Sequence, residues 1–406
     1  MHLRYPILFS LWVLLPLPAM AASDQASTSG TEAFDQCLIR LKAQAANEGI
    51  SNTGIEQTFG QIEQLPRVIA SDRAQPEFTQ SFSDYYKIRV SNRRVTTGRE
   101  KRIEFQDILQ TLAKESSVPT QYLLAFWGLE TNYGSYFGKL HIPSALATLA
   151  CDPRRAEFFT AQLMATAKIV DAGHMQPQQL VGSWAGAMGH MQFMPTTYLE
   201  YAKDANNDGR ADLHGSVADA MYSASDYLTG IGWLPGFRWG REVLLPDEFN
   251  YELTGSDNWQ PLKTWAELGV TDTAGNVMPS LDLDSAVLVP SGRHGPAFIV
   301  YPNFKVIMKW NRSEFYALSV GRLADRIAGA GGLHIPLPDS KIPTEKLIAL
   351  QDRLNQSGYN LGKADGILGP ATRRAIQSFQ KSKGLIADGF PDGATFKLID
   401  DLEITN

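Results

Sequence analysis

A single glutamate, Glu130, lies within FWGLETNYGS at 126–135, a run that is otherwise apolar, aromatic or merely hydrogen-bonding. Carboxylates avoid such surroundings, because taking the charged form out of water is costly. A carboxylic acid can donate a proton near neutral pH only if burial raises its pKa, and these surroundings would do so. Glu130 is therefore a candidate general acid. The alternative is a partly buried glutamate that hydrogen-bonds a hydroxyl or a backbone N–H.

A second motif, GSWAGAMGHMQFMPTTY at 182–198, sets small residues between large ones. Small side chains let a ligand approach the backbone closely, and Ser183 and Gln192 add polar groups to this segment. The alternative is a tightly packed pair of helices without ligand contact. Further amide and phenol groups occur in WNRSEFYALSV at 310–320 and in SASDYL at 223–228.

The helix that must position Glu130 is predicted from VPTQYLLAFWGLE. Pro119 is expected in its first turn, where a missing N–H costs nothing, and Gly134 is expected to end it. Glu130 then lies in the last turn. The residues three, four and seven positions earlier place the carboxylate on an apolar face: Trp127, Phe126 and Leu123.

Apolar spacing is mostly helical from about residue 32 to residue 202. Between about 241 and 309 the short runs AVLVP, AFIVY and KVIMKW indicate a small sheet inserted into the helical domain. Helical spacing then returns, and a proline-rich linker is expected at 336–342. The predicted fold class is therefore mainly α, with a small inserted β-sheet.

The tail, 343–406, contains an internal repeat: DGILGPAT starts at Asp365 and DGFPDGAT at Asp388. An apolar-periodic segment follows each copy, and another precedes the first. This pattern predicts three short helices separated by two similar turns, with Thr372 and Thr395 as helix N-caps.

The chain carries a net charge of −6, which gives no electrostatic basis for binding nucleic acid or an acidic membrane. One stretch, at 87–102, is basic although the whole chain has a negative net charge. It is either a solvated helix face or a contact with an anionic polymer.

The first 21 residues combine Arg4, an apolar stretch and a final Ala-Met-Ala. They are predicted to be a signal peptide, too short for a membrane span. No cysteine follows the cleavage site, so we expect a soluble periplasmic protein without a lipid anchor. Residues 22–31 are small and polar and predict a disordered lead-in.

There are two cysteines, Cys37 and Cys151. In an oxidising compartment an even pair suggests a disulfide, whereas the alternative is two separate buried thiols. A bridge over a loop of this length would stabilise the fold by about 4–5 kcal/mol in the chain-entropy model.

A possible metal site lies in DANNDGRADL. Its residues follow the spacing of positions 1, 3, 5, 6 and 9 of a calcium loop: Asp204, Asn206, Asp208, Gly209 and Asp212. Position 12 is Gly215 instead of a bidentate glutamate. The alternative is an Asx-rich turn between helices. The seven histidines show no zinc pattern, which argues against zinc-dependent amidases and endopeptidases.

Together, FWGLETNYGS and GSWAGAMGHMQFMPTTY resemble the B-type lytic murein transglycosylases, and the resemblance covers roughly residues 32–335. It implies a lysozyme-like helical catalytic domain. The tail resembles the three-helix peptidoglycan-binding module through LQDRLNQSGY, ADGILGPATRRAIQSFQ and GLIADG. The implied partner is the glycan strand of peptidoglycan.

By this resemblance Glu130 is the single catalytic acid/base. The implied reaction cleaves the β-1,4 bond between N-acetylmuramic acid and N-acetylglucosamine without water and leaves a 1,6-anhydro ring. A hydrolytic muramidase and a non-catalytic peptidoglycan-binding scaffold are the alternatives. The resemblance implies no required cofactor, although some relatives bind calcium.

The resemblance also implies substrate-binding roles for five residues. Ser183 and Gln192 match positions that hold the substrate near the acid, and Asn311 and Tyr316 match the amide and phenol that face it. Tyr227 matches another aromatic of the cleft. The alternative for both tyrosines is a place in the core.

Overall fold

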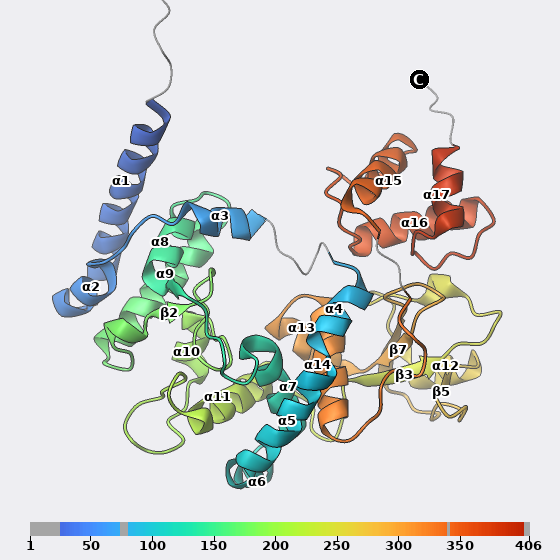
Figure 1. The fold of residues 1–406 in the computed structure, drawn as a ribbon, viewed down its shortest axis with the longest axis horizontal. Helices are drawn as coiled ribbons and strands as arrows, with labels where there is room; N and C mark the ends of the chain where they lie inside the picture. The colour runs from blue at the N-terminus through green and yellow to red at the C-terminus, as the bar shows by residue number, and fades with distance from the viewer. Residues whose placement is uncertain (1–24, 74–79, 339–341, 402–406) are drawn as a thin grey trace, which may run out of the picture.

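The computed structural model describes residues 25–73, 80–338 and 342–401, and the predicted signal peptide at 1–21 lies outside them. The chain is mainly helical, which confirms the predicted fold class (Figure 1). A small antiparallel sheet lies beside the helices, and a helical module forms the C-terminal end. Each of the three parts has its own buried apolar cluster.

Helix α1 spans Gln25–Asn47, so from residue 25 onward the structure differs from the expected disordered lead-in at 22–31, of which residues 22–24 lie outside the described residues. Its buried face contains Phe34, Leu41 and Ala45. Once such a face anchors a helix, each further residue adds a hydrogen bond at little cost, so the helix extends toward the N-terminus. Gly49 follows with φ +84°, a conformation that favours glycine.

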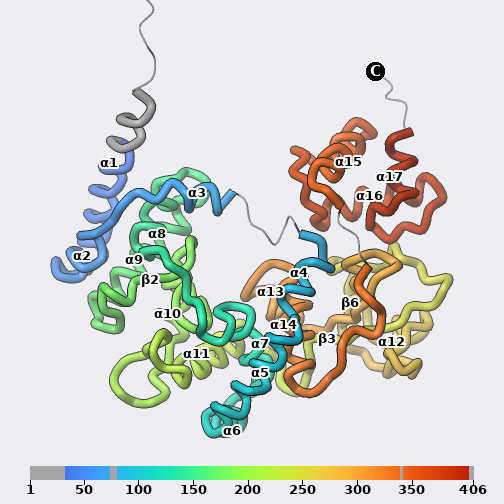
Figure 2. The backbone as a smooth tube through the Cα atoms, in the orientation of Figure 1, coloured from blue at the N-terminus to red at the C-terminus, as the bar shows by residue number. Residues whose placement is uncertain are grey.

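The helices of the large domain pack around α7, which spans Thr120–Thr131 and contacts α5, α6, α11 and α14. Figure 2 shows α4 and α5 beside α14, although they are far apart in the sequence. The remaining helices of this domain are α2 (Asn52–Phe59), α3 (Pro66–Arg73), α4 (Phe82–Arg89), α5 (Asn92–Glu104), α6 (Gln106–Glu115), α8 (Ile142–Ala150), α9 (Ala156–Asp171), α10 (Pro195–Tyr201), α11 (Val217–Gly230), α13 (Pro302–Trp310) and α14 (Glu314–Ile327), with a 3-10 turn at Pro177–Gln179.

Helix α7 ends earlier than predicted. Asn132 is its C-cap, with φ +50°, whereas Gly134 was expected to end the helix. Asparagine is the non-glycine residue that best tolerates the left-handed conformation, so it can replace glycine there. Pro119 precedes the first turn as the N-cap. Glu130 nevertheless lies in the last turn, where the sequence predicted it.

The large domain also contains a two-stranded ribbon, in which β1 (Leu140–His141) pairs antiparallel with β2 (Val181–Gly182). This pairing brings the start of the 182–198 motif next to the chain that follows α7.

The inserted sheet has the antiparallel order β4-β6-β7-β3-β5. Its elements are β3 (Gly240–Leu244), β4 (Gln260–Pro261), β5 (Thr271–Asp272), β6 (Asp284–Leu288) and β7 (Ala297–Val300), with the short helix α12 (Leu262–Glu267) and a 3-10 turn at Tyr251–Leu253. The prediction of a strand for KVIMKW was wrong, because these residues form the end of α13. Pro302 suits the first helical turn, and the buried Asn303, Phe304 and Ile307 follow helical rather than alternating spacing.

The C-terminal module consists of α15 (Thr344–Gln356), α16 (Pro370–Ser382) and α17 (Gly393–Asp400). The sequence repeat corresponds to a repeated hydrogen-bond pattern. The side-chain N–H of Gln351 donates to Asp365 Oδ1 and Thr372 Oγ1, while its carbonyl accepts the Gly366 N–H. Each copy of the repeat therefore uses one buried glutamine to join a turn to the next helix.

The second copy repeats this pattern with Gln380 as the buried glutamine: it donates to Asp388 and Thr395 and accepts from Gly389. The two threonines lie inside the helices, so their assignment as N-caps was wrong. The N-caps are Gly369 and Asp392. The threonine hydroxyls are buried and serve the glutamines instead.

A disulfide joins Cys37 of α1 to Cys151, the residue that follows α8. Two separate thiols are therefore absent, and α1 is covalently linked to the helical domain. Within the described part of the chain, no helix is long and apolar enough to cross a membrane.

Candidate active site

The carboxylate of Glu130 receives two hydrogen bonds on one oxygen. Trp310 Nε1 donates to Oε1 over 3.0 Å, and the Tyr316 hydroxyl donates to the same atom. Glu130 comes from α7, Trp310 is the last residue of α13 and Tyr316 lies in the first turn of α14. Three helix ends therefore meet at one partly buried carboxylate.

Aromatic rings surround Trp310. Ring centroids lie 4.3 Å away for Phe126, 5.1 Å for Tyr227 and 5.6 Å for Phe193. Tyr227, which the resemblance assigned to the site, thus packs on the Trp310 ring that donates to Glu130. Such a cluster excludes water and offers ring faces, so it can strengthen hydrogen bonds to the carboxylate.

Tyr316 is completely buried, which raises its pKa well above the ordinary value; the neighbouring charge of Glu130 adds to this effect. The phenol therefore stays neutral and remains a hydrogen-bond donor over the whole physiological pH range. A donor of this kind stabilises the ionised form of Glu130.

Replacing Tyr316 by phenylalanine should lower kcat about 10- to 100-fold with little change in KM, because a hydrogen bond to a charged group is lost at constant shape. The measurement is the initial rate of product release from purified sacculi. Tyr222→Phe is the matched control, since the Tyr222 hydroxyl donates to Glu115 over 2.9 Å at the surface. Equal losses in both variants would contradict a role of Tyr316 at the acid.

Ser183 and Gln192 shape the loop between β2 and α10. The Ser183 hydroxyl accepts the Ala187 N–H over 3.0 Å, and the Ser183 N–H donates to the Ala187 carbonyl over 2.9 Å. Gln192 has φ +49°, and its amide donates to the carbonyls of Phe137 and Gly189. Both side chains therefore hold the backbone of this loop in a compact form.

Asn311 lies between the two donors to Glu130 in the chain. Its N–H donates to the Ile307 carbonyl over 3.2 Å, and its carbonyl accepts the Ser313 N–H over 2.8 Å. These bonds make the tight turn from α13 to α14, which sets where Trp310 and Tyr316 point.

His190 connects the 182–198 motif to the end of α7, a role that the sequence did not indicate. Its Nδ1 accepts from Trp127 Nε1 over 2.9 Å, and its carbonyl accepts the Thr131 hydroxyl over 2.8 Å. Trp127 and Thr131 flank Glu130 on α7. A Cβ at Gly134 would lie only 2.4 Å from the imidazole, so the backbone that follows α7 packs closely against this ring.

Burial lowers the pKa of His190 to about 4, with a further contribution from His214. The unfolded chain binds this proton near pH 6.5 but the folded chain does not, so stability falls as the pH drops from 6.5 toward 4. We expect a loss of about 2 kcal/mol between pH 7 and pH 5 from this group.

Urea unfolding at the two pH values tests this expectation, with His190→Gln as the comparison. The variant keeps an acceptor for Trp127 but does not titrate, so its stability should fall less by about that amount. His141, whose pKa is also lowered by burial, contributes equally to both proteins. The difference between the two proteins therefore measures His190 together with its interaction with His214. Parallel pH dependences would rule out the effect.

The 204–212 loop is arranged by hydrogen bonds to its own backbone. Asp204 accepts from the N–H groups of Asp208 and Gly209, and Asn206 Oδ1 accepts from the N–H of Asp208. The fully buried Asp219 accepts from the N–H groups of residues 205 and 212 and so closes the loop. Nowhere among residues 25–73, 80–338 and 342–401 do three His, Cys, Asp or Glu side chains gather closely enough to hold a metal ion.

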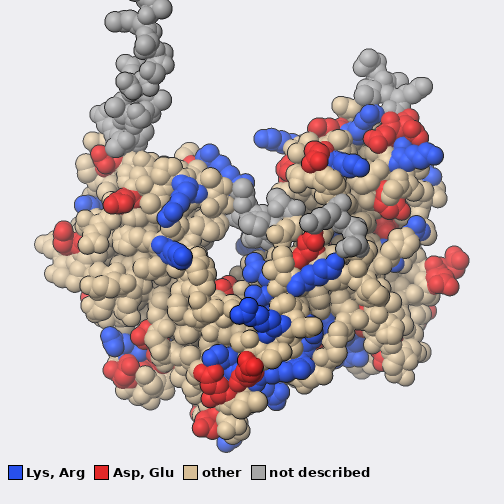
Figure 3. Space-filling model, in the orientation of Figure 1, with Lys and Arg blue, Asp and Glu red and all other residues tan. Residues whose placement is uncertain are grey.

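The surface drawn in Figure 3 is hollowed between the part with α8 to α10 and the part with α13 and α14, and Lys and Arg side chains gather at its edge. In the basic stretch at 87–102, Arg94 donates to the carbonyls of Ile88 and Arg89, and Arg99 donates to that of Arg326. These two arginines therefore serve the fold.

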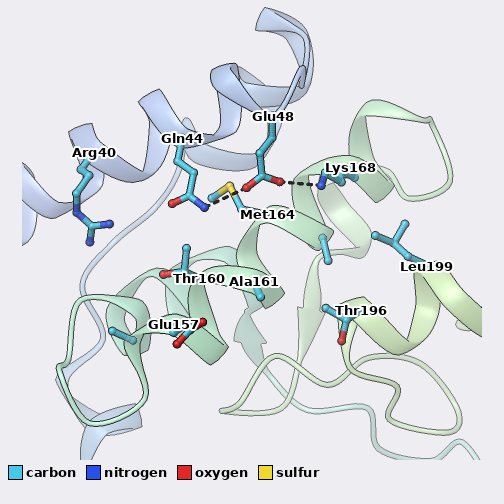
Figure 4. Close-up of a pocket in the computed structure, with 12 residues that line it drawn as sticks. Arg40, Gln44, Glu48, Glu157, Thr160, Ala161, Met164, Lys168, Thr196 and Leu199 are labelled. Atoms are coloured by element: carbon cyan, nitrogen blue, oxygen red, sulfur yellow. Dashed lines mark hydrogen bonds and ion pairs between the residues drawn. The ribbon is translucent and has the colours of Figure 1, made fainter.

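A cavity of about 570 Å³ lies away from this site, between α1, α9 and α10 (Figure 4). Glu48 in its wall is already bonded to Lys168 over 2.7 Å and to Gln44 over 3.0 Å. Glu130 does not line this cavity. We assign no chemistry to it.

Comparison with known proteins places this site in a family. The model of the transglycosylase SLT domain matches residues 33–325, and that of the putative peptidoglycan binding domain matches residues 344–399. Crystal structures of SltB3 from Pseudomonas aeruginosa, in complex with NAG-NAM-pentapeptide and with NAG-anhNAM-pentapeptide, are each 38% identical. Each superposes with a TM-score of 0.85 over 90% of this chain and 99% of that chain.

Two relatives from Escherichia coli are more distant. The lytic transglycosylase Slt35 in complex with calcium is 27% identical, with a TM-score of 0.62 over 72% of this chain and 92% of that chain. Membrane-bound lytic murein transglycosylase B of strain K12 is 31% identical over 233 residues. That match covers 55% of this chain and 61% of the relative, so the chain spans less than two thirds of that protein's length.

These matches confirm the resemblance predicted from the two motifs and from the C-terminal repeat. The first family match extends over most of the chain and includes Glu130, Trp310 and Tyr316. The chain therefore belongs to the transglycosylase SLT domain family and carries a peptidoglycan-binding domain behind it.

Proposed function

We propose that this protein is a lytic transglycosylase that cleaves the β-1,4 bond between N-acetylmuramic acid and N-acetylglucosamine in peptidoglycan, leaving 1,6-anhydro ends. The observation that carries the proposal is the carboxylate of Glu130, held by Trp310 and Tyr316 within an aromatic cluster. A relative of this chain supports peptidoglycan as the substrate, since SltB3 was crystallised with NAG-anhNAM-pentapeptide.

Glu130 acts twice in this mechanism. In its protonated form Glu130 passes a proton to the glycosidic oxygen as the C1–O bond breaks. The sugar's own 6-hydroxyl then attacks C1, and its proton returns to the carboxylate. No water is consumed. Trp310 and Tyr316 stabilise the carboxylate between the two proton transfers, since both donors are in place before it forms.

The other predicted residues have positioning roles in this proposal. Ser183 and Gln192 hold the loop against which the glycan lies, Tyr227 supports the indole of Trp310, and Asn311 orients an acetamido group. The contacts described above support the roles of Ser183, Gln192 and Tyr227, whereas the role of Asn311 rests on its match to the family motif.

Digestion of purified sacculi followed by mass spectrometry tests the proposed function. A lytic transglycosylase releases muropeptides with anhydro ends, each one water lighter than the product of hydrolysis. Reducing ends would instead identify a muramidase, and no soluble product would identify a peptidoglycan-binding scaffold.

We infer a weak structural calcium site in the 204–212 loop, which forms only when its aspartates move together around the ion, because without the ion they do not gather closely enough to hold one. Carboxylate and amide oxygens at Asp204, Asn206, Asp208 and Asp212 are the ligand type that calcium prefers, and Gly209, with φ +92°, makes the sharp turn. The relative Slt35 was crystallised with calcium. The buried Asp219 is engaged by two backbone amides and does not replace the missing glutamate, so affinity should be in the millimolar range, on the order of 10⁻⁴–10⁻³ M.

Millimolar calcium should therefore raise the melting temperature by a few degrees, because an ion that binds only the folded loop stabilises it. EDTA should reverse the shift, and Asp208→Asn should abolish it. Magnesium at the same concentration is the control for ionic strength. If neither calcium nor EDTA changes the melting temperature, the loop is a metal-free Asx turn.

We also propose export to the periplasm, with residues 1–21 removed, a catalytic domain at 32–335, a linker at 336–342 and a peptidoglycan-binding domain at 343–406. The Cys37–Cys151 disulfide supports an oxidising compartment. Osmotic shock should release the activity with periplasmic markers; recovery in the membrane pellet would contradict a soluble protein.

A further inference from the structure

A second cavity, of about 430 Å³, lies between the C-terminal module and the large domain. Its walls come from all three parts of the protein. Phe82 and Arg312 belong to the helical domain, Leu288 to the inserted sheet, and Leu368 and Phe390 to the module. Figure 1 shows the module above the sheet, with α15 and α16 facing the end of α4. The cavity therefore exists only where the module is docked.

Directional hydrogen bonds hold the module in this position. Arg373 Nη2 donates to the Pro290 carbonyl over 2.8 Å, and the Gln377 amide donates to the Tyr251 carbonyl over 3.1 Å. In the other direction, the Arg293 N–H donates to Asp388 over 2.9 Å.

Three ion pairs join the two sides of this contact: Arg374 with Asp257 over 2.5 Å, Lys381 with Glu252 over 2.7 Å, and Arg293 with Asp392 over 3.6 Å. These contacts, together with the three hydrogen bonds to the module, give the cavity defined walls.

The lining combines apolar walls with charges of both signs. Arg312 is exposed at its edge, and Glu314 lies two residues further along the chain. Arg373 is partly buried, and the charges of Glu314 and Asp388 both act on it. A ligand that fits such a lining has small apolar groups, at least one carboxylate and an amine. A short peptide with several carboxylates and a free amine has this chemistry, whereas a neutral sugar does not.

One short segment of chain connects the lining of the cavity with the residues that bond the catalytic acid. Residues 312–315 line the cavity. Tyr316 follows this segment directly and Trp310 lies two residues before it, and both donate hydrogen bonds to Glu130. Phe315 in the wall also packs edge-on against Phe82, at 5.3 Å between ring centroids. The wall of the cavity is therefore continuous along the chain with the two residues that bond the carboxylate of Glu130.

We propose that this cavity binds the stem peptide of the peptidoglycan strand whose sugars lie at Glu130, so that the module and the large domain recognise the peptide jointly. This inference rests on the proposed function, because it takes peptidoglycan as the substrate. Arg312 supplies the charge for a stem carboxylate, and Glu314 supplies the charge for the amine of the diamino acid.

Binding of a synthetic L-alanyl-γ-D-glutamyl-diaminopimelyl tripeptide to the full chain tests the proposal by calorimetry. Arg312 is exposed, so Arg312→Glu should leave the fold intact while it reverses the charge at the opening. We expect the affinity for the tripeptide to fall at least about tenfold. Lys397→Ala is the matched control and should bind like the wild type, because Lys397 is an exposed basic residue of α17 that does not line the cavity.

A parallel activity assay compares glycan strands with and without stem peptides. The wild type should cleave the peptide-bearing strands faster, and Arg312→Glu should lose this preference while keeping its rate on peptide-free strands. Equal tripeptide affinity in wild type and Arg312→Glu, or no binding to either, would overturn the proposal. Failure of the wild type to release anhydro products from any strand would instead overturn the proposed function.

Discussion

Glu130→Gln should lower the rate of anhydro-muropeptide release by about 10³- to 10⁴-fold. The glutamine amide cannot donate a proton to the glycosidic oxygen, nor can its carbonyl recover one from the 6-hydroxyl. Its carbonyl can still accept the hydrogen bonds of Trp310 and Tyr316, so the site keeps its shape. Chromatography and mass spectrometry of digested sacculi measure the rate.

Glu267→Gln is the matched control for this substitution. Glu267 is exposed at the end of α12, in the inserted sheet, so the same chemical change there should leave the rate unaltered. Unfolding midpoints of both variants show whether each remains folded. A folded Glu130→Gln protein that released anhydro products at the wild-type rate would remove Glu130 from the mechanism.

The surroundings of Glu130 on its own helix could be read from the sequence, because an apolar face repeats locally every three or four residues. The donors Trp310 and Tyr316 are 180 and 186 residues away in the chain. Spacing alone says nothing about contacts at that separation. Tyr316 came from the family motif, whereas Trp310 was not assigned to the site, because the resemblance implies a tyrosine at its position in some relatives.

His190 was missed for a different reason. Its ring is buried against Trp127 and Gly134, and its carbonyl, rather than its side chain, receives the Thr131 hydroxyl. A histidine in a sequence suggests a ligand or a titrating group, but this one holds the end of α7 in its neutral form. Only the packed structure shows that role.

Errors in the secondary structure have local physical causes. KVIMKW is rich in β-branched and apolar residues, but Pro302 starts a helix three residues earlier and the buried side chains follow its period. In the module, Thr372 and Thr395 have the right residue type for caps but lie one turn too late. The repeat was visible because both copies share their turn residues, yet the buried glutamines that explain it lie outside the repeated octapeptides.

Removing the disulfide should have the largest effect on stability. The bridge between Cys37 and Cys151 closes a loop of 114 residues, so its loss should lower the free energy of unfolding by about 4–5 kcal/mol in the chain-entropy model. Removal of the bridge raises the conformational entropy of the unfolded chain more than that of the folded chain, because packing already restricts the helices in the folded state. Urea unfolding of the Cys37→Ser/Cys151→Ser protein measures the change.

The same comparison separates stability from catalysis. Helix α1 packs on α2, α8 and α9, whereas Glu130, Trp310 and Tyr316 lie on α7, α13 and α14. At low denaturant the double variant should therefore keep its rate of anhydro-product release, and it should lose that rate at a lower urea concentration than the wild type. Reductant should move the wild-type midpoint to that of the variant and leave the variant unchanged. An unfolding midpoint that is the same with and without the bridge would show that packing alone holds α1 on the domain.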